Sequence, residues 1–259
     1  MVKYTFGTDD EGAIRLESIG SFFNPLAAAF IRRHVQPQPH QVAVDLGCGP
    51  GFTTAMLAQA TGCAQVYGLD RADYFIQMAA ARFPNYTFIQ HDLTQLPFPV
   101  QADVMYVRFV LSHLSDAVQT VNHWVTALKP GGLLFIDETE TVETEVAVFR
   151  RYLALNAGMI ATQGANLWIG PQLAAGQYAA EVVASTCETF AVTNHLAATW
   201  FLPNIQTVWQ TDAYVQGQLA PDERQAIAAE VAQIKASGDT QLQNRWNLRR
   251  LVLRRKSEG

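Results

Sequence analysis

The stretch VAVDLGCGPG, residues 42–51, largely decides the fold of this 259-residue chain. Its first half is a short run of aliphatic and β-branched residues, as in a buried strand. Asp45 stands near the end of that run, and Gly47, Gly49 and Gly51 follow at every second position. Glycine allows positive φ and close approach of the backbone to a ligand, and a following helix offers unpaired N–H groups. The stretch therefore predicts a strand, a ligand-binding turn and a helix.

The spacing of these glycines bears on which ligand the turn holds. A dinucleotide-binding fingerprint, G-x-G-x-x-G/A, that starts at Gly47 needs a small residue at position 52, where this chain has Phe52. The third glycine comes one position earlier, at Gly51. A nicotinamide-dependent oxidoreductase therefore remains an alternative, with Phe52 as the feature against it.

Composition excludes several classes of protein. With 49% hydrophobic residues and a net charge of −5, the chain is typical of a globular protein and lacks a positive field for nucleic acid. Cys48, Cys63 and Cys187 are too scattered for a disulfide framework or a metal site, which favours reduced thiols in a cytoplasm. Residues 1–10 have no apolar export segment, and no later run has the length of a membrane span. We expect a cytoplasmic protein with no metal, membrane or nucleic-acid partner.

Between residues 41 and 139, short β-rich runs alternate with helix-length amphipathic runs, the pattern of a parallel sheet with crossover helices. The expected strands are 42–46, 65–69, 86–90, 103–107 and 133–136. The expected helices are 52–59, 72–82 and 116–128, the last one ended by the Lys129–Gly132 segment. We therefore predict an α/β fold with a doubly wound sheet.

The flanking segments follow other patterns. Residues 14–34 are mostly helical in pattern, are linked to the first strand by the stiff segment 36–39, and could lie over the site. After residue 139 we expect a helix at 142–160, a loop at 163–171, a strand at 187–196, a helical region at 201–235 and a strand within 246–254. The chain is thus predicted to be one domain, 1–259, with a helical lead-in at 1–40, a core at 41–139 and helical cap insertions at 140–185 and 200–245.

Five motifs in this order resemble those of the class I S-adenosylmethionine-dependent methyltransferases, especially members that act on small molecules. They are VAVDLGCGPG, GLD ending at Asp70, HDL at 91–93, DVMYVRFVLSHL from Asp103 and LKPGGLLFIDE from Leu128. Five ordered motifs are far more specific than one glycine turn. The resemblance implies a Rossmann-like, mostly parallel seven-stranded sheet. It also implies S-adenosyl-L-methionine as cofactor, S-adenosyl-L-homocysteine as product, and methyl transfer to O, N or C of a small organic molecule.

The resemblance assigns cofactor-binding roles to residues at the strand ends. Asp45, with Gly47, Gly49 and Gly51, is expected to hold the methionine end of the cofactor. Asp70 follows the second strand, where a carboxylate can accept both ribose hydroxyls. As alternatives, Asp45 caps the turn or the helix, and Asp70 is the N-cap of the helix that follows.

Further candidates complete the cofactor site. Asp92 is expected to accept from the adenine amino group, with Leu93 packing on the ring; the alternative for Asp92 is a solvated loop acid. Arg108, after the fourth strand, is expected to contribute backbone contacts, and its alternative is a surface charge. Arg71, next to Asp70, is also counted among the predicted cofactor-binding residues. Cys48 belongs to the same set, although we interpret it as a small filler between two glycines.

Methyl transfer is an in-line displacement at an activated carbon, so proximity and desolvation can supply much of the catalysis. A base is needed when the acceptor is a phenol, an alcohol or a carbon acid. His113, just beyond the fourth strand, and Glu138, at the end of the fifth, are the candidate bases. The alternatives are a histidine bonded to the backbone and a glutamate that caps the connection.

Missing motifs point to a small-molecule substrate. The fourth strand is not followed by Asn/Asp-Pro-Pro-Tyr/Phe or by Pro-Cys, the motifs of nucleic-acid base methylation, and the basic cluster at 249–256 is expected to be a solvated strand edge. Large side chains in the insertions suit a substrate pocket, and the candidates, Trp168 first, are Trp168, Tyr152, Met159 and Trp200. A non-catalytic S-adenosylmethionine-binding protein remains a further alternative, and the sequence leaves the oligomeric state open.

Overall fold

The structure is a computed structural model that describes residues 10–36 and 41–257. Most of the predicted link at 36–39 lies outside the described residues. In the described part, seven strands form one sheet in the order β3-β2-β1-β4-β5-β7-β6. Neighbours from β3 to β5 are parallel, whereas β7 is antiparallel to both β5 and β6. The prediction of a doubly wound, mostly parallel seven-stranded sheet is confirmed.

Strands β1 to β4 match the predicted runs closely, whereas β5 is much longer than predicted. Their bounds are β1 (Val42–Leu46), β2 (Gln65–Asp70), β3 (Thr87–Gln90), β4 (Ala102–Arg108) and β5 (Leu128–Thr144). The helices among them are α1 (Asp10–Arg32), α2 (Phe52–Thr61), α3 (Asp73–Arg82), the short η1 (Leu111–His113) and α4 (Ala117–Thr126). Lys129–Gly132 therefore lies within β5, and α4 ends before it at Thr126.

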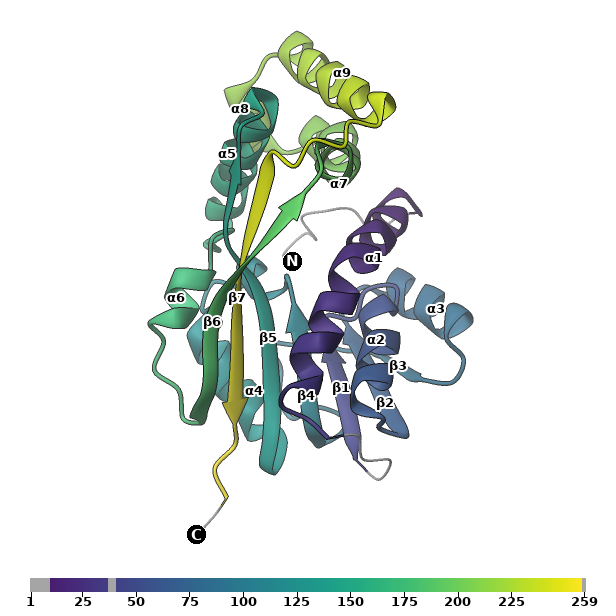
Figure 1. Ribbon diagram of the computed structural model, residues 1–259, viewed down its shortest axis with the longest axis vertical. Coiled ribbons are helices and arrows are strands. Elements are labelled where there is room, and N and C mark those ends of the chain that lie inside the picture. The colour runs from purple at the N-terminus through teal and green to yellow at the C-terminus, as the bar shows by residue number, and fades with distance from the viewer. Residues whose placement is uncertain (1–9, 37–40, 258–259) are drawn as a thin grey trace.

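Side chains of the central strands alternate between two apolar cores, as the strand period of two requires. In β4, Met105 and Val107 belong to the core that includes α4, whereas Val104 and Tyr106 belong to the core that includes α1 and α2. Helices therefore cover both faces of the sheet (Figure 1). This layering leaves the carboxyl ends of the parallel strands at one edge, where a ligand site forms in such folds.

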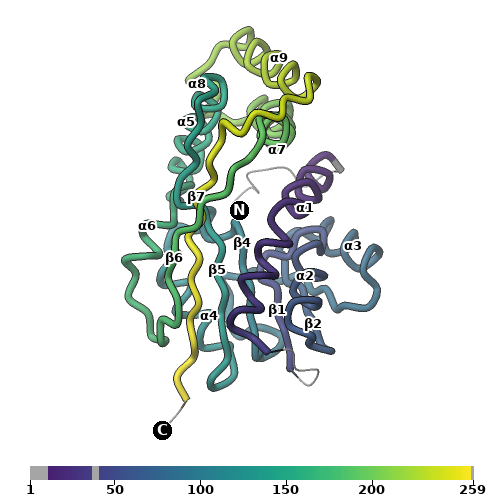
Figure 2. Tube along the Cα trace, viewed as in Figure 1, coloured from purple at the N-terminus to yellow at the C-terminus, as the bar shows by residue number. Residues whose placement is uncertain are grey.

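Three long strands of the sheet extend beyond the other strands and carry a helical cap. They are β5, β6 (Glu181–Val192) and β7 (Asn244–Arg254), which lie side by side along their length (Figure 2). The cap consists of α5 (Ala147–Ala161), α7 (Asn194–Gln206), η2 (Val208–Gln210), α8 (Ala213–Gln218) and α9 (Pro221–Ser237), and α6 (Gly170–Ala174) packs beside the sheet (Figure 1). The cap has an apolar core of its own, which Ile19 and Phe23 of α1 join.

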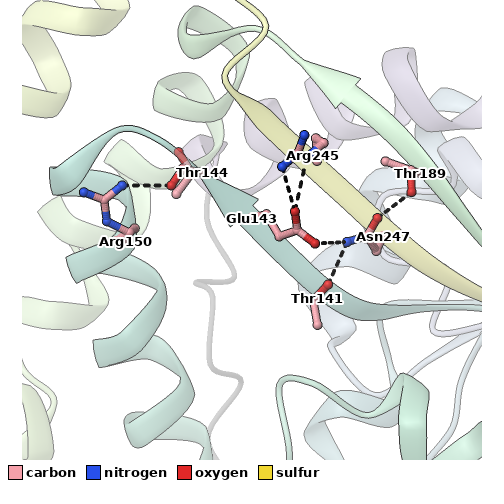
Figure 3. Close-up of polar contacts among 7 residues, drawn as sticks. All are labelled: Thr141, Glu143, Thr144, Arg150, Thr189, Arg245 and Asn247. Atoms are coloured by element: carbon pink, nitrogen blue, oxygen red, sulfur yellow. Dashed lines mark hydrogen bonds and ion pairs between the residues drawn. The ribbon is translucent and has the colours of Figure 1, made fainter.

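The extended strands have one polar and one apolar face. On the polar face, Asn247 Nδ2 donates to Thr141 Oγ1 (2.7 Å), Thr189 Oγ1 donates to Asn247 Oδ1 (2.6 Å), and Arg245 pairs with Glu143 (3.0 Å) (Figure 3). Trp246, which alternates with Arg245 and Asn247, packs into the cap core. The polar ladder therefore keeps the strands paired while the opposite face is left for the cap.

Several boundaries predicted beyond residue 139 are wrong. The helix expected at 142–160 begins only at Ala147, because Val142–Thr144 continue β5. The strand expected at 187–196 is β6, which starts at Glu181 and ends at Val192, after which Thr193 caps α7 by accepting from Leu196 N. The expected loop at 163–171 includes the start of α6 at Gly170. The insertions 140–185 and 200–245 are therefore partly strand, because cross-strand pairing overrides local helical periodicity there.

No helix in the described residues is long and apolar enough to cross a membrane.

Candidate functional site

The glycine turn between β1 and α2 has the backbone conformation that the sequence predicted. Gly47, Gly49 and Gly51 have φ values of 76°, 49° and 88°, in the region that favours glycine. A Cβ on Gly47 would lie 2.3 Å from Cγ2 of Val110, in the segment that follows β4. Gly47 N and Cys48 N donate to the carbonyl of Leu69 in β2 (2.8 and 3.0 Å), so the turn is fixed against this neighbouring strand.

Asp70, at the end of β2, meets this turn directly. Its Oδ2 accepts from Gly49 N (2.9 Å), and its Oδ1 accepts from Ala72 N (2.8 Å) at the start of α3. Burial raises the pKa of Asp70, although the hydrogen bonds from Ala72 and Gly49 oppose this rise. The carboxylate thus caps the turn into α3 and faces the glycine turn at the same time.

Asp45 lies beneath the turn and supports it from within the protein. Its Oδ2 accepts from the hydroxyls of Thr53 (2.6 Å) and Thr54 (2.7 Å) in the first turn of α2, and the residue is 1% exposed. Burial raises the pKa of Asp45 to about 6, against the effect of these hydroxyls. This arrangement corresponds to the capping alternative for Asp45. Cys48 is also buried, as expected of a small filler.

The candidates near β3 lie at the surface or in the core. Asp92 is exposed, and its Oδ1 accepts from the amide (3.0 Å) and hydroxyl (2.8 Å) of Thr94, which lower its pKa. Leu93 is buried, and its carbonyl accepts from Trp124 Nε1 (2.8 Å). Arg71 is exposed, and its carbonyl accepts from Gln90 Nε2 (3.1 Å). Asp92 and Arg71 thus follow adjacent strands, and their contact with a ligand stays a prediction.

The side chain of Arg108 reaches further into the site than the sequence indicated. Its Nη2 donates to Asn24 Oδ1 (2.8 Å) of α1, and Asn24 Nδ2 donates in turn to the carbonyl of Phe52 (3.1 Å) at the start of α2. Its Nη1 is buried and has no hydrogen-bond partner among the described residues. Sequence reasoning assigned only backbone contacts to Arg108 and missed Asn24, because only the fold brings α1 beside α2.

A pocket of about 810 Å³, counting the space continuous with solvent, lies between the cap and the sheet. Seven of its seventeen lining residues are phenylalanine, tyrosine or tryptophan. Three of the predicted pocket residues, Trp168, Tyr152 and Trp200, are among them. Met159 is a correction: it is fully buried in the cap core and does not line the pocket, because its helical position faces inward.

The pocket borders the glycine turn through α1. Leu16 lines the pocket, and its Cδ1 would lie 3.5 Å from a Cβ placed on Gly49. Phe109, Ser112 and His113 line the same pocket from the segment that follows β4, and Val110 of that segment abuts Gly47. The space above the turn and the aromatic pocket are therefore neighbours. From the sequence we expected only that the helical segment 14–34 could lie over the site, and Leu16 was not singled out.

The two candidate bases occupy different places. His113 lines the pocket, and burial, together with the charges of Arg15 and Arg71, lowers its pKa to about 4, so the ring is neutral at pH 7. Glu138 is fully buried and is absent from the lining. Its Oε1 accepts from the amides of Val110 (2.6 Å) and Leu111 (2.7 Å), and burial raises its pKa to about 8. Glu138 thus anchors the segment that carries His113. This role is close to the alternative predicted for Glu138, a glutamate that caps the connection.

Comparison with known protein families identifies the central part of the chain. A family described as "Methyltransferase domain" matches residues 44–136, the segment that runs from within β1 to within β5. Curated relatives named trans-aconitate 2-methyltransferase include one from Rhizobium rhizogenes, 37% identical over 95 residues. Another, from Escherichia coli K12, is 32% identical over 120 residues. These matches cover 36% and 43% of this chain and 37% and 47% of the relatives, so less than half of each relative's length is matched.

Solved structures share the fold over most of the chain. The YcgJ protein from Bacillus subtilis has a TM-score of 0.55 at 16% identity, covering 91% of this chain and 100% of that one. Coclaurine N-methyltransferase, solved with N-methylheliamine and S-adenosylhomocysteine, has a TM-score of 0.52 at 15% identity, covering 90% of this chain and 72% of that one. At such identities the likeness concerns the arrangement of strands and helices.

Proposed function

The chain belongs to the class I S-adenosylmethionine-dependent methyltransferases, and from this premise we propose that it transfers a methyl group from S-adenosyl-L-methionine to a small organic molecule. The observation that carries the proposal is the shared wall between two spaces. Leu16 lines the aromatic pocket and also lies beside Gly49 of the glycine turn. A donor on the turn and an acceptor in the pocket would thus be neighbours, as a direct displacement requires.

The residues around the turn fit this cofactor. The turn itself is a cradle of glycines at positive φ. The buried Nη1 of Arg108, which no described residue pairs with, is a donor suited to the carboxylate at the methionine end. Asp70 would accept from the ribose hydroxyls, and Asp92 from the adenine amino group. Asp45 would act indirectly, by fixing the first turn of α2 through Thr53 and Thr54.

When bound, S-adenosylmethionine supplies a methyl group on a positively charged sulfur. The protein's contribution is to align the acceptor and to exclude water, for which the seven aromatic side chains of the pocket provide apolar walls. His113 would orient the acceptor, because its neutral ring offers a hydrogen-bond acceptor at pH 7. Glu138 would hold the Val110–Leu111 backbone in place, and so the position of His113.

The proposal extends to the location and the partners of the enzyme. All three cysteines, which lie within the described ranges, are free, and this supports a reducing cytoplasm. The curated relatives are named for trans-aconitate, a small organic acid, which supports a small-molecule acceptor.

Calorimetric titration of the full chain with S-adenosylmethionine and S-adenosylhomocysteine tests the proposal. We expect saturable binding of both, and no binding of nicotinamide dinucleotides. A well-folded protein that binds neither sulfur compound would refute the proposal. A screen for S-adenosylhomocysteine release over carboxylates, phenols, amines and quinone precursors then separates an enzyme from a non-catalytic binding protein, since only the enzyme releases product with an acceptor present.

A further inference from the structure

The ring of Tyr152, on α5, is held in one orientation at the aromatic pocket. It stacks on Phe201 with ring centroids 4.1 Å apart and on Trp209 at 5.4 Å. The residue is 3% exposed and lines the pocket. Two stacked neighbours in a packed interior leave the ring little freedom to turn, so the packing of the cap sets the direction of its hydroxyl.

A buried network of side-chain amides adjoins this hydroxyl. Asn204 Nδ2, from α7, donates to the Tyr152 hydroxyl oxygen (3.3 Å) and to Asn156 Oδ1 (2.7 Å). Asn156 Oδ1 also accepts from Trp209 Nε1 (3.3 Å), and Asn156 Nδ2 donates to the carbonyl of Tyr152 (2.9 Å). Both asparagines are 1% exposed, so these contacts take the place of water as their hydrogen-bond partners.

Two contacts that cannot be reversed fix the orientation of both amides. The carbonyl of Tyr152 can only accept and the indole of Trp209 can only donate, which decides where Nδ2 and Oδ1 of Asn156 lie. Because Asn156 Oδ1 can only accept, the atom of Asn204 that lies 2.7 Å from it must be Nδ2. The same Nδ2 meets the Tyr152 hydroxyl, so the hydroxyl oxygen is the acceptor in that contact.

The hydroxyl proton of Tyr152 is therefore left without an acceptor among the described residues. Asn156 Oδ1 already accepts from two donors, which uses both of its lone pairs. Asn204 Oδ1 is buried and makes no hydrogen bond within the described part of the chain. Burial raises the pKa of Tyr152, so the hydroxyl keeps its proton at pH 7. Tyr152 is thus a donor whose partner has to come from outside this network.

The network lies between the interior of the cap and the pocket. Tyr152 and Asn156 line the pocket, whereas Asn204 and Trp209 are buried and absent from the lining. The contact in which the hydroxyl accepts therefore comes from the interior side. An O–H group without an acceptor in an apolar enclosure is costly, and a ligand oxygen that accepts from it removes this cost.

We propose, building on the methyltransferase function above, that Tyr152 is a specificity-determining residue whose hydroxyl donates a hydrogen bond to a carbonyl or carboxyl oxygen of the methyl acceptor. Phe201 and Trp168, which share the lining, contact the planar body that carries this oxygen. The acceptor class is then an aromatic or conjugated carbonyl compound. Tyr152 binds and orients this compound and takes no proton from it.

The test compares two ligands of one shape, of which only one has the carbonyl oxygen. The full chain is first saturated with S-adenosylhomocysteine, and this step alone reports on the proposed function. Indole-3-carboxaldehyde and 3-methylindole, which carry a formyl and a methyl group at the same position, are then titrated separately by calorimetry. We expect the aldehyde to bind roughly 5-fold or more tightly, as one net hydrogen bond implies. A pocket without such a donor gives the reverse order, because a carbonyl loses more hydration than a methyl group on burial.

Variants assign the preference to the hydroxyl. Tyr152→Phe keeps the ring and should abolish the preference for the aldehyde, while the affinity for 3-methylindole changes by less than roughly twofold. Trp168→Ala should weaken both ligands by a similar factor. Tyr178→Phe is the matched control and should change neither affinity, because the Tyr178 hydroxyl donates to the carbonyl of Leu173 (2.6 Å) and Tyr178 does not line the pocket. Circular dichroism and S-adenosylhomocysteine affinity establish that each variant is folded.

The order of the two ligands in the unaltered protein tests the inference independently of any variant. Equal affinities, tighter binding of 3-methylindole, binding of neither compound, or an unchanged preference in Tyr152→Phe would each overturn it. Binding of S-adenosylhomocysteine in the first step would still support the methyltransferase function in all of these cases. Failure of that first step would contradict the proposed function, and this inference with it.

Discussion

The glycine turn and the aromatic pocket adjoin each other, yet they are built in opposite ways. The turn consists of consecutive residues, 47–51, whose positive φ values and contacts with β2 follow from a local motif. The pocket draws its wall from α1, the segment after β4, β5, α5, α7 and β7. The comparison teaches that the turn depends on backbone geometry within a few residues, whereas the pocket depends on packing between segments far apart in the chain.

The largest expected effect is a loss of stability when a buried residue of the aromatic pocket is truncated. Trp200 is 1% exposed and contacts Phe22, Phe23 and Trp246. Trp200→Ala should lower the free energy of unfolding by about 3–5 kcal/mol, the usual cost of deleting a buried tryptophan. Urea denaturation followed by circular dichroism measures this loss, and the half-buried Trp168→Ala is the control, with a smaller loss. If the variant is still folded, its affinity for S-adenosylhomocysteine should be close to that of the wild type; a large loss would contradict the independence of the two regions.

A substitution in the glycine turn should instead weaken cofactor binding. In Gly47→Ala, the Cβ would meet Val110 Cγ2 at 2.3 Å in a backbone of φ 76°. We expect S-adenosylhomocysteine affinity to fall roughly 100-fold, about 3 kcal/mol, as measured by calorimetry. Gly131→Ala is the matched control, because Gly131 has φ 78° and nothing within 4 Å of its would-be Cβ, so it shares the backbone strain without the clash. Similar binding by the two variants would show that the contact with Val110 is unimportant.

A smaller effect tests one side chain at the turn. Asp70→Ala removes the acceptor of Gly49 N and the predicted partner of the ribose hydroxyls. We expect S-adenosylhomocysteine binding to weaken by about 1–3 kcal/mol, as for a lost hydrogen bond to a charged group. The control is Asp73→Ala, three residues away, whose carboxylate accepts from Gln77 Nε2 (2.7 Å) at the surface. Unchanged affinity in Asp70→Ala would remove this residue from the cofactor site.

The smallest effect, taken per pH unit, concerns Glu138, which contacts the Val110–Leu111 backbone between the two regions. Its pKa is raised to about 8 in the folded protein, from an ordinary value of 4.5, so between these values the native state retains a proton that the unfolded state has lost. Stability should therefore fall as pH rises through this window, by about 1 kcal/mol per pH unit between pH 5.5 and 7.5 relative to Glu138→Gln. Urea unfolding of both proteins at each pH measures the difference, and parallel pH profiles would contradict the raised pKa.

Prediction succeeded or failed according to how local the deciding interactions are. The bounds of β1 were predicted to the residue, because a run of four apolar residues and Asp45 stops at a glycine turn. Val142–Thr144 were assigned to a helix, because their helical periodicity gives no sign of Trp246 and Asn244, the partners that make them a strand. Met159 was assigned to the pocket for its size and position, but which face of α5 turns inward is set by α7, α8 and α9.

The sequence by itself determined the local features on which the proposed cofactor site rests: the strand, the glycine turn, Asp70 at the next strand end and the order of motifs that identifies the family. These features depend on backbone conformation and strand order, which short motifs encode. Only the tertiary structure placed Arg15 and Leu16 of α1 in the pocket lining, brought Asn24 to Arg108, and showed that Glu138 is buried and accepts from Val110 N. The physical reason is that the aromatic pocket is a space between packed elements, and its charge and shape exist only once those elements are packed together.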